Sequence, residues 1–60
     1  IKPNIHELEE IFKTKIDSID KTIFYATKLK DMGAENVLIS MGKDGALLID
    51  SKGKIYSEEN

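Results

Sequence analysis

The spacing of apolar residues changes at Gly33, from the period of a helix to the runs of a strand. Before Gly33, apolar residues recur every three or four positions, as they do along one face of a helix. After it, residues 37–39 and 46–49 form short unbroken apolar runs, which are typical of strands in a sheet covered on both faces. The sequence therefore predicts an α/β chain in which helices precede a sheet.

Two helices are expected ahead of Gly33, over residues 5–12 and 19–32. Asn4 is a good N-cap for the first, and Glu7 stands three positions later, where a capping-box side chain reaches back. Ser18 or Asp17 can cap the second, and Gly33 can end it in a left-handed conformation. The apolar stripe of the second helix is expected to consist of Ile19, Ile23, Ala26, Leu29 and Met32.

The remaining segments are expected to be strands and turns. Residues 1–3 suit the end of a strand, because Pro3 favours extended geometry in the residue before it. Glycine-containing turns at residues 42–45 and 50–53 separate strands at 36–41, 46–49 and 54–57. The predicted fold is thus a βαα-β unit followed by a β-hairpin and a short strand. The first crossover is expected to be right-handed.

Composition narrows the function. The chain has 60 residues, a net charge of −2 and no arginine, which argues against nucleic-acid binding, since that needs a basic stripe. No apolar run approaches the ~20 residues of a membrane span. A chain this small, without cysteine, has little to offset the entropy of folding. Together with a start at Ile1, this leads us to expect a piece of a larger, cytoplasmic protein.

The first group of candidate site residues is Lys2, Asn4 and Glu7. A strand that ends here and opens a helix places them at the carboxyl edge of a parallel sheet, where such folds bind ligands. Lys2 could contact a phosphate, and Asn4 with Glu7 could hold waters around a magnesium ion. The same pair is also an ordinary helix cap, and the two roles are compatible. His6 is not expected to bind zinc, because Glu10 stands where the second histidine of a zinc-protease helix would be.

The second group is Ser40, Gly42 and Gly45, directly after a predicted strand. Glycines three positions apart allow close backbone approach to a ligand, and exposed N–H groups there could receive phosphate oxygens. The alternative is a plain hairpin turn, for which Lys-Asp-Gly is suitable chemistry. The Walker A spacing is absent.

The two groups together resemble the central region of the ribokinase-like (PfkB-type) family of carbohydrate kinases. The residues that carry the resemblance are Lys2-Pro3-Asn4-x-x-Glu7-Leu8 and the run from Gly33 to Leu48, GAENVLISMGKDGALL. The chain is most similar to the phosphosugar branch, which comprises 1-phosphofructokinases and tagatose-6-phosphate kinases. The resemblance implies transfer of a phosphoryl group from ATP, with Mg²⁺, to a sugar phosphate.

The resemblance also implies roles for single residues. Asn4 and Glu7 would organise Mg²⁺ and the ATP phosphates, and Lys2 would approach the transferred phosphate. Ser40, Gly42 and Gly45 would form part of the nucleotide site. The general base of the family, the aspartate of a Gly-Ala-Gly-Asp run, does not occur in this sequence, and neither does the sugar-binding half.

We therefore expect residues 1–60 to be the nucleotide-side fragment of a single kinase domain, inactive alone. The parent would convert fructose 1-phosphate to fructose 1,6-bisphosphate. Tagatose 6-phosphate as the substrate remains an alternative, as does a small, non-enzymatic α/β interaction module. An isolated chain is expected either to be partly unfolded or to self-associate, burying leucines of its uncovered strands against another copy.

Overall fold

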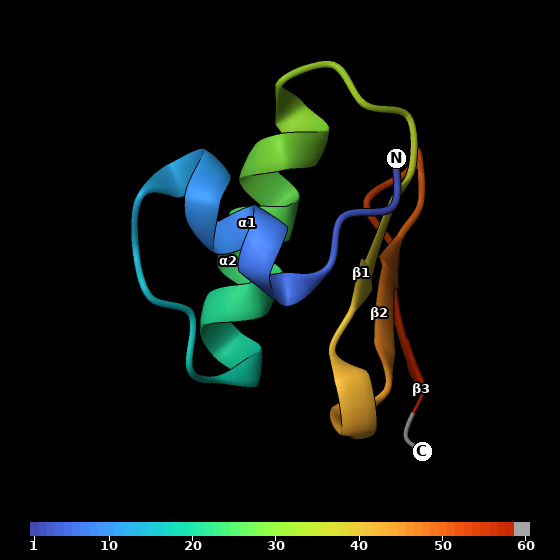
Figure 1. Cartoon of the computed structure of the whole chain (residues 1–60). Coiled ribbons are helices and arrows are strands. Elements are labelled where there is room, and N and C mark those ends of the chain that lie inside the picture. The colour runs from blue at the N-terminus through green and yellow to red at the C-terminus, as the bar shows by residue number, and fades with distance from the viewer. Residues whose placement is uncertain (59–60) are drawn as a thin grey trace.

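The computed structural model describes residues 1–58 and shows two helices packed on one side of a three-stranded sheet (Figure 1). The elements are α1 (Ile5–Phe12), α2 (Ile19–Asp31), β1 (Val37–Ser40), a 3₁₀ turn (Gly42–Asp44), β2 (Ala46–Ile49) and β3 (Ile55–Glu58). The strands lie in the order β1-β2-β3, and both neighbouring pairs are antiparallel. The predicted α/β architecture is confirmed. None of the described helices has the length and apolar character needed to cross a bilayer.

Both helices begin where their caps predict. The Asn4 side chain accepts a hydrogen bond from the N–H of Glu7, and the Glu7 carboxylate accepts one from the N–H of Asn4, each 2.9 Å long. This is a complete capping box. The Ser18 hydroxyl accepts the N–H of Lys21 at 3.1 Å, so Ser18, and not Asp17, caps α2. These local contacts are the reason that the helix starts were predictable.

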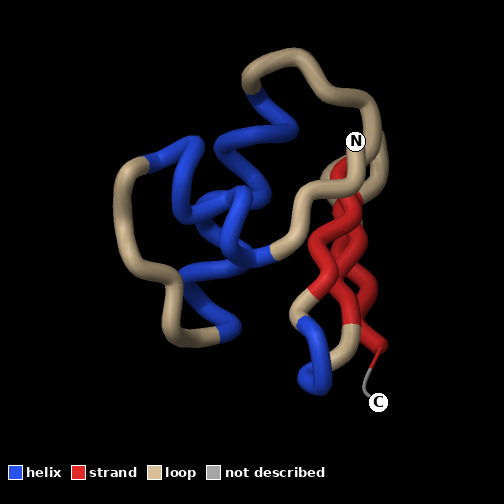
Figure 2. Tube along the Cα trace, in the orientation of Figure 1, coloured by secondary structure: helices blue, strands red, loops and turns tan. Residues whose placement is uncertain are grey.

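The N-terminal segment runs parallel to β1, as Figure 2 shows. The carbonyl of Ile1 accepts the N–H of Leu38 at 3.0 Å, and the carbonyl of Pro3 accepts the N–H of Ser40 at 3.2 Å. The predicted strand at residues 1–3 is reduced to a single parallel bridge between Asn4 and Ser40. The bridge nevertheless creates one parallel crossover beside an antiparallel sheet.

The core lies between the helices and the sheet. Its fully or nearly buried apolar side chains are Leu8, Ile16, Ala26, Leu29, Val37, Ile39, Leu47 and Ile49. The predicted stripe of α2 is wrong at both ends, since Ile19 is 49% exposed and Met32 is 70% exposed. Thr22 is buried instead, at 3% exposure, because its hydroxyl donates to the carbonyl of Ser18 at 2.9 Å and leaves no unsatisfied polar group.

Within the described residues, only one face of the sheet is covered. Side chains alternate along a strand, so Val37 and Ile39 point to the helices while Leu38 points away. The register places Leu38 opposite Leu48, and Leu48 opposite Tyr56, on the uncovered face. The prediction that these strands are covered on both faces is therefore wrong for this chain. The uncovered face still shows why the apolar runs are continuous: both of its leucines are half-buried.

The last strand begins one residue later than predicted. The Asp50 carboxylate accepts the N–H groups of Lys52 and Lys54, both at 2.9 Å, and holds Lys54 in the turn. Strand β3 consequently starts at Ile55 and extends to Glu58.

Candidate functional site

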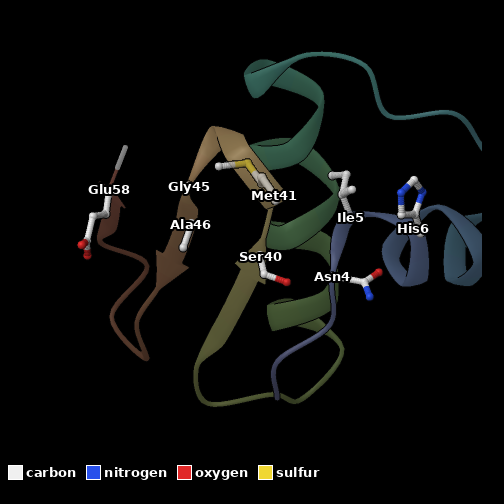
Figure 3. A pocket seen from close by; sticks show the side chains of 9 residues that line it. Asn4, Ile5, His6, Ser40, Met41, Gly45, Ala46 and Glu58 are labelled. Carbon is white, nitrogen blue, oxygen red and sulfur yellow. The ribbon is translucent and has the colours of Figure 1, made fainter. Parts of the chain in front are cut away.

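The two predicted groups of site residues meet where the N-terminal segment and β1 end. Asn4 and Ser40 form the parallel bridge, so both lie at the same edge of the sheet. A pocket opens at this edge (Figure 3) and is lined by Asn4, Ile5, His6, Ser40, Met41, Gly42, Gly45, Ala46 and Glu58. Residues 36 positions apart in the chain thus face one surface pocket, as the carboxyl ends of parallel segments are expected to do.

The structure divides the six predicted site residues between two pockets. Asn4, Ser40, Gly42 and Gly45 line the pocket at the bridge. Lys2 and Glu7 line a second pocket along the N-terminal segment and α1, together with Ile1, Pro3, Glu10 and Ile11. Asn4 connects the two, because its side chain is hydrogen-bonded to the backbone of Glu7. A ligand that contacted all six residues would have to extend past Asn4.

The glycine loop is a 3₁₀ turn that satisfies much of its own backbone. The N–H of Met41 donates to the carbonyl of Gly45 at 2.8 Å, the N–H of Asp44 to Met41 at 3.1 Å, and the N–H of Gly45 to Gly42 at 3.2 Å. These three N–H groups are therefore not available to phosphate oxygens, which narrows the predicted role of the loop. Gly42 and Gly45 have φ values of 59° and 97°, which explains why glycine stands at both positions.

The capping box leaves room for a hydrated cation beside Asn4 and Glu7. Each side chain uses one oxygen in the box, the Asn4 Oδ1 and the Glu7 Oε1. The second carboxylate oxygen, Glu7 Oε2, has no part in the cap. Among residues 1–58 no cluster of three or more metal-binding side chains occurs. Mg²⁺ commonly keeps several waters and takes only one or two carboxylates plus phosphates, so the residues present fit the predicted water-mediated site.

Sequence reasoning set His6 aside, yet it lines the pocket at the bridge. The Nδ1 of His6 lies 3.4 Å from the Glu9 Oε1. The other oxygen of Glu9 accepts the N–H of Ile16 at 2.8 Å, and this bond, assisted by His6, lowers the pKa of the Glu9 carboxyl. Glu9 therefore stays charged and helps to hold the imidazole. The one available signal was the position of His6 in the first turn of the helix that starts at the site.

Glu58 is the other pocket residue that the sequence did not indicate. The register aligns Ser40 with Ala46, and Ala46 with Glu58, in one row across the three strands. In Figure 3, Glu58 lies on the far side of Ala46 from Ser40 and Asn4. Only strand pairing brings it to the pocket, and no local sequence pattern predicts that pairing.

Comparison with known proteins identifies the class. Residues 1–59 match the sequence profile of the pfkB family carbohydrate kinase. Because this match covers nearly the whole chain, the chain belongs to the pfkB family of carbohydrate kinases, which are phosphotransferases. The predicted resemblance is confirmed.

Individual relatives narrow the comparison. The chain is 48% identical over 56 residues to a 1-phosphofructokinase of Borreliella burgdorferi, a match that covers 93% of this chain and 18% of that protein. It is 51% identical over 67 residues to a D-tagatose-1-phosphate kinase of Bacillus licheniformis, with 95% and 22% covered. The chain thus spans about a fifth of the length of these relatives.

The fold of the chain is similar to part of a solved kinase. It superposes on phosphofructokinase-2 from Escherichia coli, in complex with fructose-6-phosphate, with a TM-score of 0.84 and 27% identity. The superposition covers 97% of this chain and 19% of that one. The two-helix, three-strand unit is therefore an established component of the ribokinase-like fold.

Proposed function

We propose that residues 1–60 form the nucleotide-side region of an ATP- and Mg²⁺-dependent kinase that converts fructose 1-phosphate to fructose 1,6-bisphosphate. The observation that carries the proposal is the bridge between Asn4 and Ser40, which joins the two family motifs at one pocket. Relatives named 1-phosphofructokinase, 41% to 48% identical to the chain, support the choice of substrate. A cytoplasmic location stays a prediction.

The residues of the chain would bind and neutralise phosphates. Lys2 is exposed at the end of the N-terminal segment and can approach an anionic group. Helix α1 begins at the pocket, so the positive end of its dipole favours anions there. Glu7 and Asn4 would hold the waters of Mg²⁺, which would neutralise charge on the transferred phosphoryl group. Phosphoryl transfer depends mainly on such positioning and charge neutralisation, which these residue types supply.

A second substrate has specific support. The relative named D-tagatose-1-phosphate kinase is 51% identical to the chain, as similar as the phosphofructokinases. This favours tagatose 1-phosphate over the tagatose 6-phosphate of the sequence-based alternative. The two substrates are separated by the ratio of kcat/KM for fructose 1-phosphate and tagatose 1-phosphate, measured on the full-length kinase.

The test of the Mg²⁺ role uses a matched pair of variants at Glu7 in the full-length kinase. Glu7→Gln retains a capping-box side chain but removes the negative charge, whereas Glu7→Ala removes both. We expect Glu7→Gln to lower kcat/KM and to raise the Mg²⁺ concentration needed for half-maximal activity, without a change in thermal stability. Glu7→Ala should show the same kinetic defect and a lower melting temperature.

The control is Glu10→Gln, which removes a charge one helical turn away from the cap. It should leave the Mg²⁺ dependence at the wild-type level. Wild-type Mg²⁺ dependence in Glu7→Gln, with a defect only in Glu7→Ala, would show that Glu7 serves the helix alone and would contradict the proposed metal role.

A further inference from the structure

Strand β3 forms an open edge of the sheet. It pairs with β2 on one side, and no other strand of the described chain lies on its second side. All four of its residues, Ile55–Glu58, are exposed. An open edge presents unpaired backbone groups that can add another strand.

The hydrogen-bond pattern identifies which backbone groups face outward. The N–H of Asp50 donates to the carbonyl of Lys54 at 3.0 Å, so Lys54 directs its carbonyl at β2. In an antiparallel ladder this direction alternates from residue to residue. Tyr56 and Glu58 therefore also direct their backbone groups at β2, while Ile55 and Ser57 direct theirs at the open side. A strand added there has to bond to Ile55 and Ser57.

A second copy of β3 meets this requirement in a two-fold antiparallel register. If Tyr56 lies opposite Tyr56 of the other copy, Ile55 lies opposite Ser57, and these outward-facing residues can exchange both backbone bonds. In the same register Lys54 lies opposite Glu58, twice by symmetry. Neither side chain has an ion-pair partner within residues 1–58. Opposite charges in directly facing positions stabilise strand pairs.

The uncovered face of the sheet favours the same register. Leu38, Leu48 and Tyr56 form a cross-strand row on that face. The Tyr56 ring is held in place, because its hydroxyl donates to the Asp50 Oδ2 at 3.3 Å. With Tyr56 facing Tyr56, the row continues from one sheet into the other without a break. A shift of the register by two residues would separate both the row and the charge pairs.

We propose that two copies of this chain associate through their β3 edges, antiparallel and centred on Tyr56, into one six-stranded sheet. The partner is a second copy of the chain. Charge complementarity between Lys54 and Glu58 sets the register, and the backbone of Ile55 and Ser57 forms the new ladder.

The test is a charge reversal with complementation, read by sedimentation velocity over a range of concentrations. Wild-type chain is expected to form a concentration-dependent dimer. Lys54→Glu and Glu58→Lys should each raise the dissociation constant by about tenfold or more, because two attractive pairs become two repulsive ones. A one-to-one mixture of the two variants, and the double variant, should both restore the dimer. Lys52→Glu, a reversal in the turn before β3, is the matched control and should dimerise like the wild type.

Three results would overturn the proposal. A wild-type chain that stays monomeric at the highest concentration, folded or unfolded by circular dichroism, excludes the dimer. A dimer that neither single reversal weakens excludes the register. Weakened single variants that fail to recover on mixing show that the substitutions act on folding and not on pairing between copies.

Discussion

Truncation of two adjacent leucines on β2 tests which face of the sheet is covered. Leu47 is 1% exposed and faces the helices, while Leu48 is half-buried on the other face. Leu→Ala removes roughly three methylene-sized groups, each worth about 0.8 kcal/mol when fully buried. Leu47→Ala should therefore cost at least ~2.4 kcal/mol, and about 2–5 kcal/mol once the remaining cavity is counted.

Leu48→Ala should cost about half of the transfer value, roughly 1 kcal/mol, because part of the side chain is already in water and solvent fills the space. A domain of this size has about 3–9 kcal/mol of total stability, so the two variants should be easy to tell apart. The assay is urea unfolding of the sixty-residue chain, followed by far-UV circular dichroism at a fixed protein concentration.

Equal losses for the two variants would refute the reasoning, because they would mean that both faces are covered. A larger loss for Leu48→Ala would mean that the strand register is shifted by one residue, since such a shift exchanges the two faces. The same pair in the full-length kinase gives a useful contrast. There, a Leu48→Ala loss that rises to the Leu47→Ala level would show that another part of the protein packs on the uncovered face.

Three further predictions concern the turns, the caps and the activity of the chain. The N–H groups of Lys54 and Lys52 and the hydroxyl of Tyr56 hold the pKa of the Asp50 carboxyl below its ordinary value of 3.8. The contribution of Asp50 to stability should thus be present above that pH and be lost as the pH falls through the lower, folded-state pKa; urea midpoints of wild type and Asp50→Asn should converge at acid pH, and a constant gap would contradict this. Ser18→Ala should destabilise α2 by about 1 kcal/mol and Ser18→Asp by much less, as read from melting temperatures, and equal losses would argue against the cap. A coupled kinase assay of residues 1–60 with ATP, Mg²⁺ and fructose 1-phosphate should show no turnover above background, and any Mg²⁺-dependent transfer would contradict the view that the catalytic base lies elsewhere.

The features that followed from the sequence are those set by neighbours along the chain. Asn4 and Glu7 are three residues apart, and their capping box needs no tertiary contact to form. Ser18 capped α2 for the same reason, and the glycines at 42 and 45 marked a turn that requires positive φ. The resemblance of the two motifs to a kinase family was also a property of sequence alone, and the family match confirmed it.

The features that the sequence could not decide depend on pairing between distant segments. Thr22 replaced Ile19 in the core because a hydrogen bond to Ser18 satisfied its hydroxyl, and because burial depends on where the sheet lies against the helix. The continuous apolar run 37–39 does not show which of its side chains face the helices. Strand register decides that, and a shift of one residue would reverse it.

The candidate site divides along the same line. Residue types and spacing selected Asn4, Glu7, Ser40 and the glycines, because metal and phosphate chemistry require such groups. Their meeting at one pocket required the parallel bridge between Asn4 and Ser40. Glu58 reached that pocket only through the pairing of β2 with β3. Local interactions are encoded within a few residues of sequence, whereas register and burial are decided by the packing of the whole chain, and only the tertiary structure contains them.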